Sequence, residues 1–413
     1  MNIMNQPNFN IGTLGSVSDG KSTLIYQLTG IKTQRHSSEQ HRNITIKPGY
    51  ANLKIWECLE CNTNYSSGTQ LMEYLCSNCD SECKLIHHIS FVDCPGHQEL
   101  ILTMMGSVSL MKGAIVVISA AEPILKKPQL IQHLIAAKKA NIDKIIICFN
   151  KLDLITKELA LERKEELDKL LNTLGITASI IIPTALNQKL GIDNVLQSIL
   201  DIFPPEVNEI TNEPLFRITR SFDINKPSTS WLDVKGGVIG GSLIKGSLNI
   251  GDQIEIRPGI LTRGKDGRYT HTPIITNILS IESDNVNLDS ITPGGLVAIL
   301  TDIDPYYTKG DMLSGNILGK VGELPTVYHD ISLEYSKLEE FDGIWNPKNG
   351  DAVYLQIGNI TSEARLTKIK GSILSFQLIK PSCIEKDSKI LVCRKELSIL
   401  KIVGMGFLFK NIT

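Results

Sequence analysis

The sequence has neither an excess of charge of one sign nor a long apolar run. Its 42 Lys and Arg side chains nearly balance 44 Asp and Glu, which leaves a net charge of −2 at pH 7. Binding of nucleic acid through overall charge is therefore excluded, and any such contact must use a local surface. No apolar run reaches the roughly 18 residues of a membrane-spanning helix. The start, MNIMNQPNFNIG, lacks the basic and apolar regions of a signal peptide, so we expect no membrane partner.

Cysteine is also scarce, with nine residues in a chain of 413. Four of them form the pairs Cys58-x2-Cys61 and Cys76-x2-Cys79, which is the spacing of two zinc knuckles. Four thiolates in tetrahedral array suit a structural Zn²⁺ and would fix an inserted hairpin at residues 56–83. Cys83 is near enough in sequence to serve as a substitute ligand, and a cluster of free cysteines is the alternative. This use of cysteine predicts a reducing, cytoplasmic location.

Residues 10 to about 205 alternate short β-branched runs with helical patterns. Lys144–Phe149 is nearly all apolar, as in strands that are buried on both faces, and Pro128–Ala140 has a helical pattern. The alternation predicts an α/β domain with a doubly wound, mostly parallel sheet over residues 1–208. Glycine-punctuated β segments follow, and they predict two β-barrels, at 209–325 and 326–413.

The segment Gly15-Ser-Val-Ser-Asp-Gly20-Lys21-Ser22 matches the pattern GxxxxGK[ST] between a predicted strand and a predicted helix. Glycines let backbone N–H groups turn toward phosphates at the positive end of the helix. Lys21 would contact the β- and γ-phosphates, and the Ser22 hydroxyl would bind Mg²⁺. A glycine turn with a chance lysine is the alternative, but the context favours a phosphate loop.

Asp93-Cys-Pro-Gly96 follows the next core strand. Asp93 would hold Mg²⁺ through water, and the Gly96 N–H would contact the γ-phosphate, so that loss of this phosphate releases the loop. Thr45, within residues 42–47, is a candidate first switch whose hydroxyl would complete the Mg²⁺ shell. His97 would orient the attacking water, although a lone histidine is more often structural.

Asn150-Lys151-Leu-Asp153 ends a third core strand. The Asp153 carboxylate would accept two hydrogen bonds from the N1–H and amino groups of guanine, a donor pair that adenine lacks. A surface turn would explain this motif alone equally well. Three motifs in this order, each at the carboxyl end of a predicted parallel strand, lie at the edge where open α/β sheets bind ligands. Together they predict a GTPase that binds GTP or GDP with Mg²⁺.

Four stretches resemble the gamma subunit of eukaryotic and archaeal translation initiation factor 2: RNITIKPGYANLKIW (42–56), DCPGH (93–97), RSFDINKP (220–227) and KGGVIGGSLIKGSLNIGDQIEIRPG (235–259). The resemblance covers nearly the whole chain, and the plan is similar to that of elongation factor Tu. It implies a G domain and two β-barrels. It also implies GTP-dependent delivery of methionyl initiator tRNA to the small ribosomal subunit, together with alpha and beta subunits. Hydrolysis would be the release switch, slow without a GTPase-activating partner, and nucleotide-exchange factors would reset it.

The resemblance also carries site residues onto this chain by position. The implied GTP-binding set is Gly15, Val17, Asp19, Gly20, Lys21, Ser22, Thr23, Gly96, Asn150, Lys151, Asp153, Thr184, Ala185 and Leu186. The implied Mg²⁺ set is Ser22, Thr45 and Asp93, and the implied catalytic residue is His97. The implied tRNA contacts are Tyr50, Lys235, Gly236 and Gly237.

Departures from the family leave other functions open. The family usually has histidines where this chain has Ser16 and Asp19, and the Asp19 charge is expected to weaken nucleotide binding or to change the hydrolysis rate. GSVSDGKST also resembles the phosphate loop of the GTPase subunit of ATP sulfurylase (sulfate adenylyltransferase). The remaining alternatives are an elongation factor that delivers a special aminoacyl-tRNA and a scaffold that binds GTP without turnover.

Overall fold

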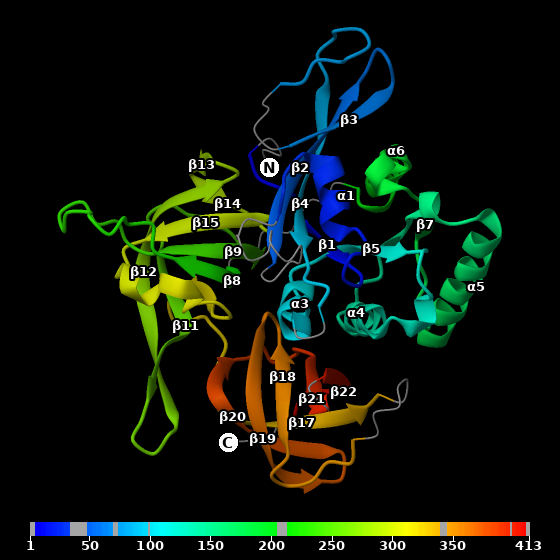
Figure 1. Cartoon of the computed structure of the whole chain (residues 1–413). Helices are drawn as coiled ribbons and strands as arrows, with labels where there is room; N and C mark the ends of the chain where they lie inside the picture. The colour runs from blue at the N-terminus through cyan, green and yellow to red at the C-terminus, as the bar shows by residue number, and fades with distance from the viewer. Residues whose placement is uncertain are drawn as a thin grey trace. The chain divides into compact units, whose positions relative to one another are not determined.

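The computed structural model describes residues 5–33, 48–68, 73–97, 100–204, 213–338, 345–396 and 399–409. The chain divides into two compact units, residues 2–207 and residues 208–413 (Figure 1). Within the described part of the chain, no helix has both the length and the apolar character needed to cross a bilayer.

The first unit is built on a seven-stranded mixed sheet in the order β3-β2-β4-β1-β5-β6-β7. Strands β4, β1, β5, β6 and β7 run parallel, and β2 and β3 form an antiparallel extension next to β4. The bounds are β1 (Asn10–Leu14), β2 (Gly49–Cys58), β3 (Thr63–Ser67), β4 (Lys84–Asp93), β5 (Gly113–Ser119), β6 (Ile145–Asn150) and β7 (Ile180–Pro183). This arrangement confirms the predicted α/β class.

The central strands of this sheet are mostly apolar, and helices cover both of its faces (Figure 1). Every residue of β1, β5 and β6 is buried, as expected of strands covered on both faces. The helices are α1 (Lys21–Thr29), α3 (Ile101–Val108), α4 (Pro128–Lys139), α5 (Lys157–Leu174) and α6 (Ile192–Ile202), with short 3₁₀ turns η2 (Ile124–Lys126), η3 (Leu152–Leu154) and η4 (Leu186–Gln188).

Helix α5 illustrates how the sequence pattern selects the buried face. Its N-cap residue, Thr156, accepts a hydrogen bond from the Leu159 amide, and Gly175 ends it in the left-handed conformation. Four leucines at helical spacing form its buried stripe: Leu167, Leu170, Leu171 and Leu174.

The second unit begins with a β-barrel. Strands β11, β16, β8, β9, β15 and β12 form its wall in that order, and pairing of β11 with β12 closes it. The bounds are β8 (Leu215–Phe222), β9 (Val238–Lys245), β10 (Leu248–Asn249), β11 (Gln253–Arg263), β12 (Tyr269–Ser283), β13 (Val286–Leu288), β14 (Ser290–Ile291), β15 (Leu296–Thr301), η5 (Pro305–Tyr307), η6 (Lys309–Asp311) and β16 (Ile317–Lys320).

A second closed barrel follows, in the order β17-β20-β19-β18-β21-β22. Burial alternates along strands such as β19, because every second side chain faces the barrel interior. The bounds are β17 (Val327–Lys337), β18 (Ala352–Ile357), β19 (Ile360–Lys370), β20 (Ile373–Cys383), β21 (Ile390–Glu396) and β22 (Ile399–Leu408). Each barrel encloses its own apolar core, so both predicted barrels are present.

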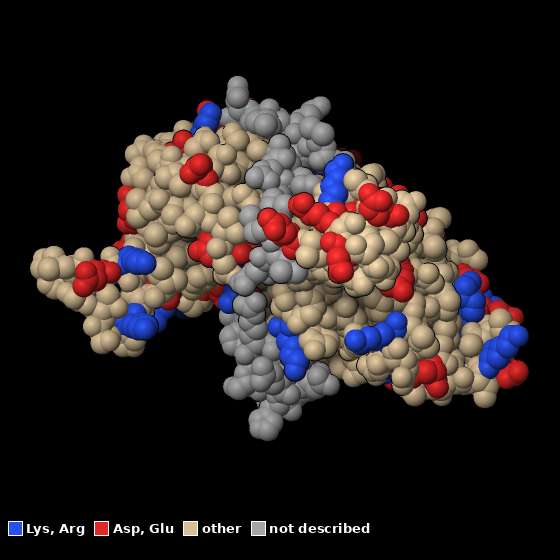
Figure 2. Space-filling view, turned by 90° about the horizontal axis from the view of Figure 1, so that it is seen from above, with Lys and Arg blue, Asp and Glu red and all other residues tan. Residues whose placement is uncertain are grey.

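Basic and acidic side chains are interspersed over the face shown in Figure 2. This pattern agrees with the nearly balanced charge of the sequence.

Candidate functional site

The predicted phosphate loop joins β1 to α1. Gly20 is the N-cap residue of α1 and has a φ of 111°, which favours glycine. Lys21 Nζ folds back over the loop and donates hydrogen bonds to the carbonyls of Gly15 (3.1 Å) and Ser16 (2.7 Å). Burial lowers the pKa of Lys21, and the charges of Asp93 and Asp19 oppose this shift.

Gly96, the glycine of the DCPG motif, lies directly against this loop. A Cβ atom at Gly96 would lie 2.5 Å from Lys21 Nζ and 2.9 Å from the Val17 amide nitrogen. Since such contacts are shorter than van der Waals packing allows, only glycine fits there. The structure therefore brings the first two predicted motifs together.

Asp93 ends β4 as a fully buried acid with three hydroxyl donors. Its carboxylate accepts hydrogen bonds from Ser22 Oγ (2.7 Å), Thr33 Oγ1 (2.6 Å) and Thr13 Oγ1 (3.1 Å). Hydroxyl and carboxylate oxygens are the ligands that Mg²⁺ prefers, so this donor set fits the ion. Sequence reasoning missed Thr33, and Thr45 lies outside the described residues.

Asp19 is buried and paired with a lysine that the sequence analysis did not single out. Its carboxylate contacts Lys127 Nζ at 2.6 Å and accepts hydrogen bonds from the amides of Ser16 (2.8 Å) and Ser119 (3.2 Å). The expectation that Asp19 adds negative charge near phosphates must therefore include the opposite charge of Lys127.

The third motif is tied to the loop through Asn150. Asn150 Nδ2 donates to the Asp19 carbonyl (2.9 Å), and its Oδ1 accepts from the Leu186 amide (3.0 Å) and from Thr184 Oγ1 (3.4 Å). Asp153 is exposed in the short turn η3, and its neighbour Lys151 has a φ of 65°. Residues 150–153 and 184–186 thus form one connected edge beside the loop.

The other predicted residues of this site differ in their surroundings. Val17 and Thr23 are half-buried, Ala185 is buried, and the His97 side chain is exposed just after Gly96. His133 of α4 was not predicted, yet its Nδ1 accepts a hydrogen bond from the Gly15 amide at 3.1 Å. Burial is the main reason that the pKa of His133 falls to about 3, so this histidine is neutral.

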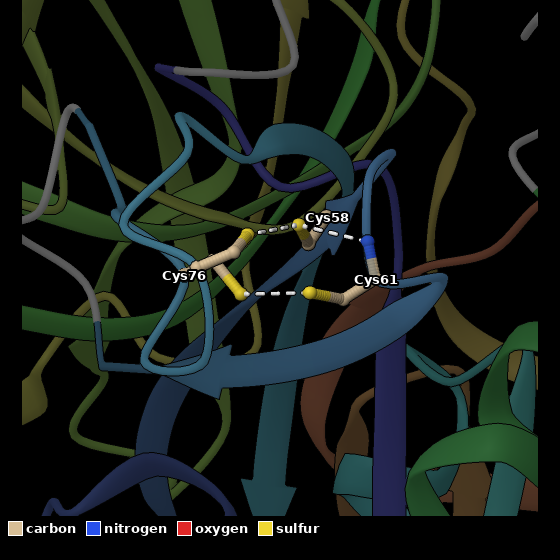
Figure 3. A group of neighbouring side chains, drawn as sticks. Cys58, Cys61 and Cys76 are labelled. Atoms are coloured by element: carbon tan, nitrogen blue, oxygen red, sulfur yellow. Dashed lines mark hydrogen bonds between the residues drawn. The ribbon is translucent and has the colours of Figure 1, made fainter.

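The four predicted cysteines converge at the tip of the β2–β3 extension. Their sulfur atoms all lie within 4.8 Å of one another, with Cys58–Cys79 at 3.5 Å and Cys61–Cys76 at 3.8 Å. A tetrahedral Zn²⁺ with Zn–S bonds of about 2.3 Å requires sulfur separations of about 3.8 Å, so the set fits the ion. In Figure 3 the sulfurs of Cys58, Cys61 and Cys76 point toward one another.

The surroundings of these cysteines support a preformed site. The Cys61 amide lies 3.4 Å from Cys58 Sγ, and the Asn78 amide lies 3.4 Å from Cys76 Sγ. A hydrogen bond with the Tyr65 hydroxyl is the main cause that lowers the pKa of Cys76, to about 6. Cys83 is buried beside them, but it is not part of the four-sulfur cluster found among the described residues.

The predicted tRNA-contact residues are divided between the two units. Tyr50 lies on β2 opposite Val92 in the first unit. In the second unit, the backbone of Lys235 forms two hydrogen bonds with the Asn225 side chain (2.7 and 2.8 Å), and the Gly237 amide donates to the Ile303 carbonyl. The Lys235 side chain is exposed.

Comparison with known proteins identifies the family. The model of the elongation factor Tu GTP binding domain matches residues 6–205, and that of the C-terminal part of initiation factor eIF2 gamma matches residues 330–408. Eukaryotic translation initiation factor 2 subunit gamma of Encephalitozoon cuniculi is 38% identical over 97% of this chain and 92% of its own length. The chain belongs to the translation initiation factor 2 gamma family. Translation initiation factor 2 subunit gamma of Methanocaldococcus jannaschii is also 38% identical, over 97% of each chain.

Among solved structures, a bacterial selenocysteine-specific elongation factor is similar, with a TM-score of 0.72 at 21% identity. The match covers 97% of this chain and 58% of that one, and at this identity it shows a shared fold. As a member of the initiation factor 2 gamma family, the chain is a translation initiation GTPase that binds GTP and GDP.

Proposed function

We propose that this chain binds methionyl initiator tRNA in its GTP state and delivers it to the small ribosomal subunit, with GTP hydrolysis as the release switch. The observation that carries the proposal is full-length similarity to initiation factor 2 gamma subunits, at 38% identity over 97% of the chain. Alpha and beta subunits of the same factor, a GTPase-activating protein and an exchange factor are its proposed partners. The cytoplasm, where ribosomal subunits work, is its proposed location.

The phosphates of GTP would lie in the loop of residues 15–20. Lys21 now donates to two loop carbonyls, and these bonds would be exchanged for bonds to the β- and γ-phosphates. Gly96, which lies close to Lys21, would then contact the γ-phosphate, so that the conformation of the segment after it would depend on that phosphate. Val17 and Thr23 would complete the phosphate contacts from the loop and from the first turn of α1.

Ser22 and Asp93 would hold Mg²⁺ between them, with Thr45 joining in the GTP state. The ion, when bound, neutralises phosphate charge. Ser22 Oγ and Asp93 Oδ2 already share a hydrogen bond of 2.7 Å, so both oxygens face the same point. Thr13 and Thr33 orient the Asp93 carboxylate by donating to it.

Asp153 would select guanine, since its carboxylate matches the two adjacent donors of that base. Asn150 holds this edge together by joining the phosphate loop to the Leu186 amide. Lys151 would cover one face of the base, and Thr184, Ala185 and Leu186 would border it.

His97 would position the water that attacks the γ-phosphate. Its side chain is exposed, so it must turn inward, and we propose that an activating protein favours this rotation. Hydrolysis by the isolated chain would consequently be slow.

Structural Zn²⁺ at Cys58, Cys61, Cys76 and Cys79 would fix the end of the β2–β3 extension. Four thiolates leave no open position for a substrate, so the ion would act on folding alone. Tyr50, Lys235, Gly236 and Gly237 would contact the acceptor end of the tRNA.

Competition between tRNAs tests the proposal and separates it from its nearest alternative. In the presence of a non-hydrolysable GTP analogue, labelled methionyl initiator tRNA should be displaced by its unlabelled form and poorly by charged elongator tRNAs. Equal displacement by an elongator tRNA would point to an elongation factor. Absence of tRNA binding together with co-purification of a sulfurylase subunit would favour the sulfate-activating alternative.

A further inference from the structure

Asp19 and Lys127 form a buried ion pair within the proposed nucleotide site. Lys127 Nζ lies 2.6 Å from Asp19 Oδ1, and the two side chains are 5% and 1% exposed. Asp19 belongs to the phosphate loop, whereas Lys127 is the N-cap residue of α4. Charges removed from water persist only when they are paired and hydrogen-bonded, so each of these side chains depends on the other.

The pair connects three parts of the site. The Asp19 carboxylate accepts the Ser16 amide of the loop and the Ser119 amide at the end of β5. Lys127 Nζ returns a hydrogen bond of 3.2 Å to the Ser119 carbonyl. The Asp19 carbonyl accepts from Asn150 at the end of β6. Asp19 and Lys127 therefore tie the phosphate loop to the ends of β5 and β6.

The charges of the pair oppose each other where phosphate would bind. Asp19 raises the pKa of the neighbouring Lys21, and Lys127 lowers it. Alone, a carboxylate in the loop would repel an anionic ligand, since unit charges still interact appreciably at several ångströms in a protein. Because Lys127 neutralises it, the Asp19 carboxylate can hold the loop by hydrogen bonds without adding net negative charge to the site.

We propose that Lys127 is a positioning residue for nucleotide binding, which neutralises Asp19 and so lets the carboxylate hold the phosphate loop beside an anionic ligand. The ligand class is a nucleoside di- or triphosphate. The inference rests on the proposed role of residues 15–22 in phosphate binding.

The sign of the charge distinguishes this role from a merely structural one. Lys127→Met leaves the Asp19 charge in the phosphate loop without its cation, so affinity for GDP and GTP should fall by about tenfold or more. Asp19→Asn keeps an oxygen for the Ser16 amide, and Lys127 keeps the Ser119 carbonyl and Glu122 (3.5 Å). Because this variant removes the charge but keeps part of the hydrogen bonding, it should lose less affinity than Lys127→Met, by about threefold at most. The double variant, with Lys127→Met and Asp19→Asn together, should bind nucleotide within about threefold of the unaltered chain.

Titration of a fluorescent GDP into the full chain and its variants measures these affinities, with circular dichroism to verify folding. Lys126→Met, which removes the exposed neighbouring lysine, is the matched control and should change affinity by less than about threefold. Lys21→Ala tests the site itself. If Lys21→Ala binds normally, the phosphate-loop role has failed. If only Lys21→Ala weakens binding, the role of Lys127 is overturned.

Equal losses in Lys127→Met and Asp19→Asn would mean a structural pair and would also overturn the inference. Should Lys127→Met fail to fold, Asp19→Asn decides alone. Nucleotide affinity of a folded Asp19→Asn protein within about threefold of the unaltered chain supports the proposal, and affinity about tenfold weaker contradicts it.

Discussion

The Gly15 amide donates a hydrogen bond of 3.1 Å to Nδ1 of His133, a residue 118 positions further along the chain. His133 must be neutral with Nδ1 free of a proton to accept this bond. Helix α4 thus supports the phosphate loop twice, through His133 and through Lys127 at its N-terminus.

Stability should fall in mild acid because of His133. Its pKa is about 3 in the folded chain and near 6.5 in the unfolded chain, so the unfolded state binds more protons between these values. The contribution of His133 is complete above pH 6.5 and is lost progressively below it, at up to about 1.4 kcal/mol per pH unit. Urea unfolding at pH 7.0, 6.0 and 5.0 should show a smaller loss in His133→Asn, whose oxygen replaces Nδ1 as acceptor. Equal slopes in the unaltered chain and in His133→Asn would remove His133 from this account.

Asp153→Asn should shift the nucleotide preference of the chain from guanine toward xanthine. The side-chain amide has one acceptor fewer than the carboxylate for the two guanine donors. Its N–H can instead donate to the oxygen that xanthine has in place of the guanine amino group. GDP affinity should fall about 10²-fold while XDP affinity rises. Equilibrium titration with both nucleotides measures the exchange, with Asp168→Asn on α5 as a control. Unchanged GDP affinity in Asp153→Asn would show that another group reads the base.

His97→Ala should separate binding from hydrolysis. Since this role concerns the attacking water and not the nucleotide, GTP affinity should stay within about threefold. Single-turnover hydrolysis with an activating protein should slow by about 10²-fold, as expected when a group that positions the reacting water is removed. Equal hydrolysis rates in His97→Ala and in the unaltered chain would mean that His97 has no role in positioning the water.

Zinc content should depend on four of the five neighbouring cysteines. Elemental analysis of purified protein should give about one zinc per chain, as one four-thiolate cluster requires. Cys79→Ser, at the most exposed of the four, should lose the metal, whereas Cys83→Ser should retain it. Retention of zinc by Cys79→Ser would mean that Cys83 replaces the missing ligand.

Local sequence patterns predicted the parts of the site that are contiguous in the chain. Glycine spacing predicted the loop between β1 and α1, and paired cysteines predicted the sulfur cluster. Both signals are local, because the glycines supply the positive φ that the loop needs and the cysteines follow the ligand spacing of a metal.

Contacts across the sheet were missed, since they depend on strand order. Thr33 reaches Asp93 because the segment after α1 returns to the end of β4, and Lys127 reaches Asp19 because β5 lies next to β1. Nothing in the single sequence marks the lysine before Pro128 as the partner of an acid 108 positions earlier. Asp19 was therefore assigned a charge but not a partner.

Binding of methionyl initiator tRNA to the purified chain, in the presence of a GTP analogue or of GDP, tests the central claim most directly. The account predicts that Met-tRNA binds at least about tenfold more tightly in the GTP-analogue state than in the GDP state, and that the uncharged tRNA loses most of this difference. Equal affinity in both nucleotide states, with the alpha and beta subunits present, would contradict a GTP-controlled carrier of initiator tRNA.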